Sequence, residues 1–282
     1  MTAFIEHSCT LEVPGWIIPA ALTVPAHSPL ASAVLLVPGS LFSDVNGDYP
    51  AWNSFPHTNA HLARKLSALG HAVYRYAKLG PGTGSVERPA PQPVGRTWEG
   101  RHHIAAAALK AMRAELAARA LEPARIIGAG HSEGAVVVSV LALSAGEIDG
   151  VVLLSGPSVG ILQIMREQAA RGVGRDVEAT LASMPEEARQ YLRDVEATDP
   201  LRLARELKQP VLVVQGGNDE MVPAHHGKRL RDAARAEYLF VPEVSHLYKV
   251  LPPGVSGPAA FGYPGETDSR VTDGIDRWIR RK

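Results

Sequence analysis

The sequence predicts an α/β fold with a mostly parallel central sheet of about eight strands, helices on both faces of the sheet and a helical cap insertion. Short runs rich in Val, Ile and Leu recur along the chain, and helix-prone segments lie between most of them. Most runs are apolar throughout, which is typical of strands that are covered on both faces in a parallel sheet. The alternation of strand and helix favours layers of helices around one sheet.

Eight segments are expected to be strands. Ile5–Val13 and Trp16–Val24 form a first pair, because Pro14-Gly15 between them is a turn signal. The six further strands are expected at Ala33–Val37, His71–Tyr76, Arg125–Gly128, Gly150–Leu154, Pro210–Gln215 and Ala236–Val241.

Five segments between and after these strands are expected to be helices. Thr58–Leu69 carries leucines at helical spacing and stops at Gly70. Ser132–Ala145 is apolar nearly all round, as expected for a helix that is buried beside the centre of the sheet. The other three are expected at Arg101–Ala120, Ala224–Ala234 and Asp268–Arg280.

Three segments interrupt the alternation. Leu79–Gly100 and Leu251–Gly265 are rich in Gly and Pro and are expected to be long loops, which in compact domains are often functional. Ser158–Lys208 is charged and helix-prone, so we expect a helical cap over residues 158–208 within a single domain of residues 1–282. Its apolar residues available to cover a pocket are Ile161, Leu162, Ile164, Met165, Leu181, Met184, Tyr191 and Leu192.

The composition is that of an ordinary soluble globular protein, with 282 residues of which 45% are hydrophobic and 21% charged. Lys+Arg and Asp+Glu both number 29, and a net charge of zero favours neither nucleic acid nor an anionic membrane surface as a partner. The single cysteine, Cys9, forms no internal disulfide, and we find no signal peptide and no membrane span. We therefore expect a cytoplasmic protein.

The segment Gly130–Gly134 reads Gly-His-Ser-Glu-Gly and lies between a predicted strand and a predicted helix. A serine flanked in this way at a strand-to-helix turn is the pattern of a nucleophile elbow. The turn is so sharp that side chains at the glycine positions would collide, and the positive end of the following helix faces the reacting oxygen. The alternative interpretation is that Ser132 merely caps the helix.

A serine hydroxyl needs a base, and histidine is the natural one near neutral pH. His246 and Asp219 each follow a predicted strand, so we expect both at the carboxyl edge of the sheet together with Ser132. Their order in the chain, Ser then Asp then His, is the order typical of this arrangement. Asp199 is the alternative acid, although Asp199-Pro200 favours a helix start. Histidines on predicted helices are expected at the surface, namely His102, His103, His225 and His226.

Two backbone N–H groups are expected to hold the oxyanion that forms in such a reaction. One belongs to Glu133, and the other comes from the loop Pro38–Leu41, with Ser40 as the first choice and Leu41 as the alternative. The Glu133 side chain is expected to be a solvated charge at the helix start. The His131 side chain is expected to point away from the reacting atoms.

The Gly130–Gly134 motif, with Pro38-Gly39-Ser40 upstream and Asp219 and His246 downstream, resembles the α/β-hydrolase superfamily, and within it bacterial serine esterases and dienelactone-hydrolase-like proteins. Pro38 stands where the family usually has histidine. Further similar segments, in the same order, are Leu35–Ser40, Tyr76–Ser85, Asp199–Asp219 and Val244–Val250. The resemblance implies the α/β-hydrolase fold and a serine hydrolase that cleaves small to medium carboxylic esters through an acyl-enzyme, with no cofactor and no metal.

Other interpretations stay open. An acyltransferase or a peptidase would use the same Ser132, Asp219 and His246, and a non-catalytic small-molecule binder would keep only the pocket. The segment Asp44–Asp48 is oxygen-rich but lacks the pattern of a calcium loop, so we expect a turn. The resemblance to esterases implies that this acidic segment lines the pocket mouth. Some aromatic residues in or near the loops are expected to wall an acyl pocket, from among Trp52, Phe55, Trp98, Phe261 and Tyr263.

Overall fold

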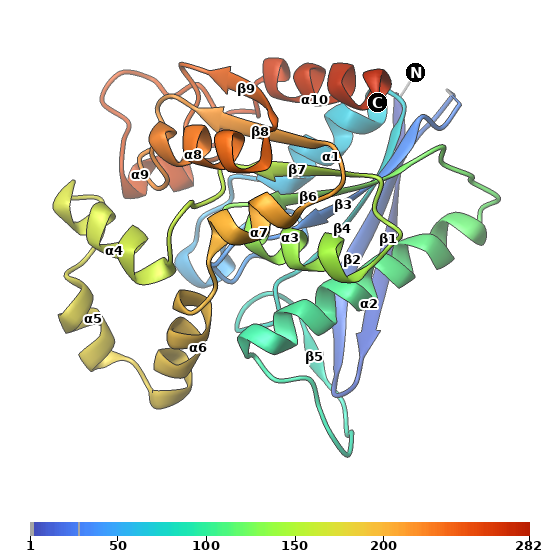
Figure 1. The fold of residues 1–282 in the computed structure, drawn as a ribbon. Helices are drawn as coiled ribbons and strands as arrows, with labels where there is room; N and C mark the ends of the chain where they lie inside the picture. The colour runs from blue at the N-terminus through green and yellow to red at the C-terminus, as the bar shows by residue number, and fades with distance from the viewer. Residues whose placement is uncertain (1–2, 28) are drawn as a thin grey trace.

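The computed structural model describes residues 3–27 and 29–282 and contains one sheet with helices on both faces (Figure 1). Within these residues the sheet has nine strands in the order β1-β2-β4-β3-β6-β7-β8-β9, and the short β5 pairs with β2. The strands are β1 (Phe4–Val13), β2 (Trp16–Pro25), β3 (Ser32–Val37), β4 (His71–Tyr76), β5 (Val86–Glu87), β6 (Ile126–His131), β7 (Gly150–Leu154), β8 (Val211–Gly216) and β9 (Glu237–Val241).

The strand directions confirm the predicted, mostly parallel sheet. β1 and β2 form an antiparallel hairpin in which Val13 pairs with Trp16, and Gly15 in the turn has a φ of +87°. β2 also runs antiparallel to β4, whereas the six strands β4, β3, β6, β7, β8 and β9 all run parallel to one another. The carboxyl ends of these six strands therefore lie at one edge of the sheet, which is the edge expected to carry the site.

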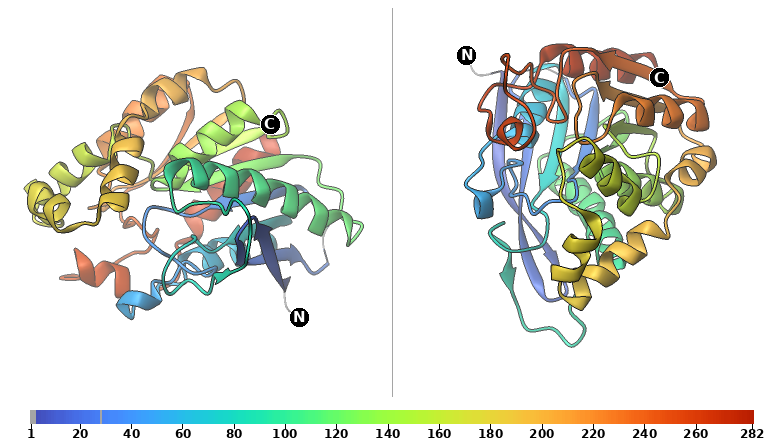
Figure 2. Two further views of the ribbon diagram at one scale, coloured as in Figure 1. Left: turned by 90° about the horizontal axis from the view of Figure 1, so that it is seen from below. Right: turned by 90° about the vertical axis from the view of Figure 1, so that its left-hand side faces the viewer.

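Two layers of helices cover the sheet (Figure 2). One face carries α1 (Thr58–Ala68) and α10 (Ser269–Arg281), which pack on each other and on strands β4 and β9. The other face carries α2 (Trp98–Ala117), α3 (Gly134–Ser144), α7 (Pro200–Glu206) and α8 (Ala224–Ala234). The side chains of the central strands β3, β4, β6, β7 and β8 are buried on both faces, which explains why these strand sequences do not alternate.

Three helices between β7 and β8 stand outside these layers, at the left of Figure 1: α4 (Ile161–Ala170), α5 (Val177–Ser183) and α6 (Glu186–Glu196). We call them the outer helices. α4 contacts α5 and α6, and α6 also contacts α2. The segment 158–208 thus contains helices and no strand, as expected. Its last helix, α7, instead packs against α3 and α8 in the inner layer.

The two expected long loops contain regular structure that the sequence did not reveal. α2 begins at Trp98 rather than Arg101, because the Thr97 hydroxyl accepts a hydrogen bond from the Gly100 N–H at 3.0 Å and caps the helix. β5 is only two residues long and pairs with the start of β2. The second loop contains the short helix α9 (Pro258–Gly262).

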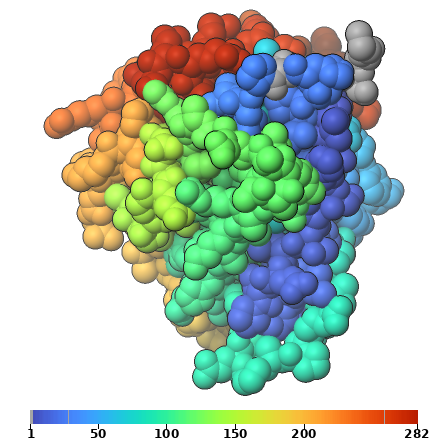
Figure 3. All heavy atoms as spheres, turned by 90° about the vertical axis from the view of Figure 1, so that its right-hand side faces the viewer, coloured from blue at the N-terminus to red at the C-terminus, as the bar shows by residue number. Residues whose placement is uncertain are grey.

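β1 forms one edge of the sheet and is seen in dark blue beside the end of α2 in Figure 3. It carries Cys9, which is half-buried and forms no disulfide. Burial, with the nearby Glu115 carboxylate as a second cause, raises the pKa of the Cys9 thiol to about 11. No helix in residues 3–27 and 29–282 combines the length and the apolar character needed to cross a lipid bilayer.

Candidate active site

Ser132 lies at the turn between β6 and α3 with a φ of +56°, a left-handed conformation that is strained for a residue with a side chain. Its N–H donates to the carbonyl oxygen of Leu154 at 2.8 Å, which fixes the turn to the neighbouring strand β7. The two glycines of the motif are required by close packing. A Cβ on Gly130 would lie 2.0 Å from the Gly134 oxygen, and a Cβ on Gly134 would lie 2.5 Å from the Val37 oxygen.

We expect the substitution Gly130→Ala to destabilise the fold by about 3 kcal/mol, because backbone atoms rather than a movable side chain occupy the space of the new methyl group. The free energy of unfolding from urea denaturation measures this effect. Gly146→Ala is the matched control, since a Cβ at Gly146 has no neighbour within 4 Å. Equal stability of the two variants would contradict the packing described for the turn.

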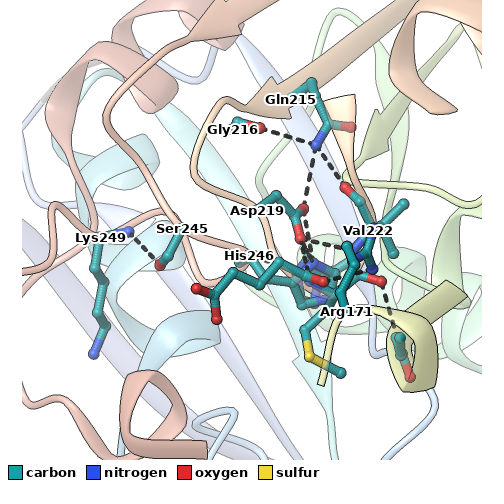
Figure 4. Close-up of polar contacts among 12 residues, drawn as sticks. Arg171, Gln215, Gly216, Asp219, Val222, Ser245, His246 and Lys249 are labelled. Carbon is teal, nitrogen blue, oxygen red and sulfur yellow. Dashed lines mark hydrogen bonds and ion pairs between the residues drawn. The ribbon is translucent and has the colours of Figure 1, made fainter. Parts of the chain in front are cut away.

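Asp219 and His246 meet at the carboxyl edge of the sheet, on the loops that follow β8 and β9 (Figure 4). The imidazole Nδ1 lies 3.0 Å from Oδ1 and 2.9 Å from Oδ2 of the carboxylate. The two residues are buried, at 5% and 7% exposed, so water screens this contact little. The sequence-predicted acid and base are therefore in direct contact.

The Asp219 carboxylate is held by further donors that fix its orientation. Its Oδ1 accepts hydrogen bonds from the N–H groups of Met221 at 3.0 Å and Val222 at 2.8 Å. Its Oδ2 accepts from Nε2 of the buried Gln215 at 3.2 Å, and the same amide nitrogen donates to the carbonyl oxygen of Val222 at 2.9 Å (Figure 4). Sequence reasoning missed Gln215, although a lone glutamine at the end of the apolar run Pro210–Gln215 was a visible signal.

His131 packs against His246, with the ring centroids 4.6 Å apart, so the expectation that its side chain points away from the reacting atoms is wrong. Its Nε2 lies 2.9 Å from the carbonyl oxygen of His246. Because a carbonyl only accepts, this nitrogen carries the ring proton and donates it. Burial, together with the neighbouring His246, lowers the pKa of His131 to about 3. His131 is thus a neutral ring that supports the backbone of His246.

A cavity of about 580 Å³ opens at this edge of the sheet, and both Ser132 and His246 line it. In the described chain no hydrogen bond joins the Ser132 hydroxyl to His246. Catalytic hydrogen bonds are often long in unliganded enzymes and shorten only when substrate binds. The structure therefore brings Asp219 and His246 into contact and places Ser132 on the wall of the same cavity.

The candidate oxyanion donors line this cavity as well. Gly39 lies against the elbow, since a Cβ at this position would be 3.3 Å from Cβ of Ser132. Ser40, Leu41 and Glu133 are all on the cavity wall. Among the hydrogen bonds formed by residues 3–27 and 29–282, none uses the backbone N–H of these three residues as donor. These three N–H groups, which belong to residues that line the cavity together with Ser132, therefore have no acceptor among the described residues.

The Glu133 side chain is buried at 3% exposure, so the expectation of a solvated charge is wrong. Its Oε1 lies 3.2 Å from Arg101 and 3.5 Å from Lys78, and it accepts a hydrogen bond from the Tyr191 hydroxyl at 2.7 Å. Burial alone would raise the pKa of Glu133, but Lys78 and Arg101 hold it below its usual value. Burial lowers the pKa of Lys78 to about 7. Sequence reasoning missed both cations, because nothing marks the Lys78 side chain within the segment Tyr76–Ser85 and Arg101 lies within a predicted helix.

The rest of the cavity wall is largely apolar. Six of the eight apolar residues expected from residues 158–208 line the cavity, whereas Leu162 and Leu181 do not. Phe261 lines it as expected, whereas Trp52 and Phe55 are exposed. Trp98 is buried and donates a hydrogen bond to the Thr198 hydroxyl. The six residues are Ile161, Ile164, Met165, Met184, Tyr191 and Leu192, and the other Phe and Tyr side chains on the wall are Phe42 and Tyr49.

Two other candidates have structural roles. The Asp199 carboxylate accepts from the N–H groups of Leu201 at 2.9 Å and Arg202 at 3.1 Å, so this residue caps α7 as its sequence context favours. Asp44 accepts from the N–H groups of Asn46 and Asp48 at 2.8 and 2.9 Å. The oxygen-rich segment is therefore a turn, and its acidic residues are absent from the described cavity wall.

The expected surface position is wrong for His226, which is fully buried beneath α4, whereas His103 and His225 are exposed and His102 is half-buried. Glu167, His225 and His226 place ligand atoms within 4.8 Å of one another, close enough for a metal ion. However, the Ser158 N–H donates to Nδ1 of His226 at 3.3 Å, so Nε2 carries the ring proton and donates to Glu167 at 2.9 Å. These bonds tether α4 to α8 rather than leave an open ligand set.

No protein-family model matches the chain. The chain is similar to esterase EstD of Thermotoga maritima, with 26% identity over 290 residues that cover 93% of this chain. The match covers 65% of EstD, so the chain spans less than two thirds of the length of this relative.

Solved esterase structures share the architecture. Est1E from Butyrivibrio proteoclasticus matches with a TM-score of 0.62 and 16% identity, covering 97% of this chain and 98% of Est1E. Carboxyl esterase 2 from the fungus Tuber melanosporum matches with a TM-score of 0.64 and 16% identity, covering 100% of this chain and 87% of that protein. The chain thus has the α/β-hydrolase fold of these esterases, as its sequence motifs implied.

Proposed function

We propose that this chain is a serine hydrolase that cleaves carboxylic esters, with Ser132 as the nucleophile, His246 as the general base and Asp219 as the carboxylate that orients the imidazole. One observation supports the proposal above all: His246, which is paired with the buried Asp219, and Ser132 in its left-handed turn line the same cavity. The similarity to EstD and to solved esterases supports ester hydrolysis as the reaction.

In the proposed mechanism, Nε2 of His246 takes the proton of Ser132 while its oxygen attacks the ester carbonyl carbon. The N–H groups of Glu133 and of Ser40, or of Leu41 in its place, hold the negative oxygen of the tetrahedral intermediate, each worth about 3 kcal/mol of transition-state stabilisation. His246 then gives its proton to the leaving alcohol, and the acyl group stays on Ser132. Water, deprotonated by His246, releases the acid and restores the serine.

The cavity suits a substrate whose acyl or alcohol group is apolar and of small to medium size. Its wall is built from aliphatic and aromatic side chains, and the outer helices supply much of it. We propose that residues 158–208 act as a cap within a single domain, with α4 and α6 covering the cavity. Est1E has also been solved with ferulic acid bound, and the aromatic side chains of Phe42, Tyr191 and Phe261 on this cavity wall suit an aromatic acid as well.

Turnover of p-nitrophenyl acetate, butyrate, octanoate and laurate tests the reaction and its size range. Because the cavity is about 580 Å³ in volume and its wall is largely apolar, we expect kcat/KM to be higher for butyrate and octanoate than for acetate, and the value for laurate shows where the size range ends. A fluorophosphonate probe should label the protein at Ser132, as shown by peptide mapping. A protein that neither hydrolyses these esters nor takes the label would be a binder on this fold, and the proposal would be wrong.

A further inference from the structure

The loop that carries the proposed oxyanion donors is bound by two cations, which line the same cavity. Arg101, on α2, donates from Nη2 to the Pro38 oxygen at 2.7 Å and from Nη1 to the Gly39 oxygen at 2.8 Å. The Lys78 ammonium group donates to the Ser40 oxygen. Three successive carbonyl groups of the loop are therefore bound by two buried side chains.

These bonds determine where the N–H groups of the loop point. In a trans peptide the carbonyl and the N–H belong to one planar unit and point in opposite directions. The Gly39 carbonyl shares its peptide with the Ser40 N–H, and the Ser40 carbonyl shares its peptide with the Leu41 N–H. Drawing the two carbonyls toward Arg101 and Lys78 turns both candidate donors away from these cations, and both residues line the cavity.

Burying two cations is costly unless an anion lies beside them. Glu133 supplies that anion, with Oε1 3.2 Å from Arg101 and 3.5 Å from Lys78. Glu133 is also the residue after Ser132, and its own N–H is the other proposed oxyanion donor. The same ion cluster thus contacts both halves of the oxyanion hole.

The cluster also reaches the outer helices through Tyr191 of α6. The Tyr191 hydroxyl donates to Oε1 of Glu133 at 2.7 Å. The Lys78 ammonium lies 5.4 Å from the centroid of the Tyr191 ring, within the range of a cation–π contact. The position of α6 is thereby tied to the anion that balances Arg101 and Lys78.

We propose that Arg101 and Lys78 are positioning residues that orient the N–H groups of Ser40 and Leu41, that Glu133 is their shared counter-ion, and that Tyr191 couples the position of α6 to this arrangement. The inference rests on the proposed function, because an oxyanion hole has meaning only if an oxyanion forms. All four side chains line the cavity, but the proposed role of Arg101 and Lys78 is exerted through the backbone carbonyl groups that they bind. The tetrahedral intermediate therefore depends on Arg101 and Lys78 more strongly than substrate binding in the ground state does.

The substitution Arg101→Lys tests the central residue, because lysine keeps the charge but lacks the planar fork that binds two carbonyls at once. We expect kcat for p-nitrophenyl butyrate to fall by about 30-fold, with KM changed by less than about twofold. The inhibition constant of butylboronic acid, which forms a tetrahedral adduct with the serine, should rise by a similar factor. In Arg101→Ala, added guanidinium at millimolar concentration should restore part of kcat.

Arg113→Lys is the matched control, since Arg113 lies exposed on the same helix α2. It should leave kcat, KM and the boronate inhibition constant unchanged. Circular dichroism and the melting temperature of each variant show whether the fold is retained. If Arg101→Lys does not fold, Glu133→Gln carries the same test, because the amide has nearly the same shape but does not balance the cations.

Tyr191→Phe tests the coupling to α6. We expect kcat to fall by about fivefold. In the double variant with Arg101→Lys, the fall in kcat should be smaller than the product of the two single falls, because both changes disturb one cluster. Tyr238→Phe is the control, since the Tyr238 hydroxyl has no hydrogen-bond partner in the part of the chain that the structure describes.

The outcomes separate this inference from the proposed function. If the wild-type protein hydrolyses esters, and folded Arg101→Lys and Glu133→Gln variants match it in kcat and in boronate inhibition, the positioning role is wrong while the serine hydrolase stands. A fall in kcat that tracks the melting temperature, with boronate inhibition unchanged, also overturns it, because that is the signature of a structural ion cluster. If the wild-type protein neither hydrolyses esters nor labels at Ser132, both proposals fail.

Discussion

Replacing Ser132 by alanine should lower kcat for p-nitrophenyl butyrate by about 10⁶-fold, as removal of a nucleophile that acts together with its base does. The alanine has no oxygen to form the acyl-enzyme, so only water attack assisted by the oxyanion donors remains. Steady-state turnover at neutral pH measures the loss, and fluorophosphonate labelling should disappear with it. The fold should be retained, because no hydrogen bond of the described chain uses the Ser132 hydroxyl.

Ser144→Ala is the control for this experiment, because Ser144 lies exposed at the end of the same helix α3 and its hydroxyl donates only to the Leu141 oxygen. It should keep both turnover and labelling. Turnover at the wild-type rate in a Ser132→Ala preparation, with the control equally active, would remove Ser132 from the mechanism.

Asp219→Asn should lower kcat by about 10⁴-fold while leaving the shape of the site intact. The N–H groups of Met221 and Val222 need an acceptor, so the asparagine oxygen turns toward them and its NH₂ group faces Nδ1 of His246. Nδ1 must then accept a hydrogen bond, and the ring proton moves to Nε2. In that tautomer Nε2 has no lone pair with which to take the proton of Ser132. The dependence of kcat/KM on pH, measured for the wild-type protein and for Asp219→Asn, reports this change in the tautomer of His246.

Asp199→Asn tests whether Asp199, rather than Asp219, is the carboxylate that orients His246. Asparagine caps helices as well as aspartate does, so the α7 terminus should hold and kcat should stay within about twofold of wild type. Loss of activity in Asp199→Asn, combined with full activity in Asp219→Asn, would reverse the assignment of the acid.

The centre of the sheet was predictable because β3, β4, β6, β7 and β8 are buried on both faces. Apolar runs such as Ala33–Val37 and Gly150–Leu154 have no polar face that could lie at the surface, so they must lie inside the sheet. The observed strands begin and end close to the expected residues. The turn at Ser132 was equally visible, because Gly130 and Gly134 are required by contacts within the motif and with the adjacent strand. Local constraints of this kind leave a signature in the sequence.

The ion cluster that binds the oxyanion loop left no such signature. Lys78 follows β4, Arg101 lies in α2, and Glu133 precedes α3, so their charges balance only after three distant segments meet. Taken alone, an acidic residue at a helix start is favoured by the helix dipole, which explains why a solvated charge was expected at Glu133. β5 could not be predicted for a similar reason, since its two residues form a strand only by pairing with Trp16 and Ile17 at the start of β2.

The raised pKa of Cys9 has a practical consequence. At neutral pH this thiol is almost wholly protonated, and the thiolate is the form that reacts with maleimides. A cysteine introduced by Ala182→Cys on the exposed side of α5 would therefore react far faster than the native one. A single dye on the outer helices, attached without first removing Cys9, would report whether they move when an ester enters the cavity.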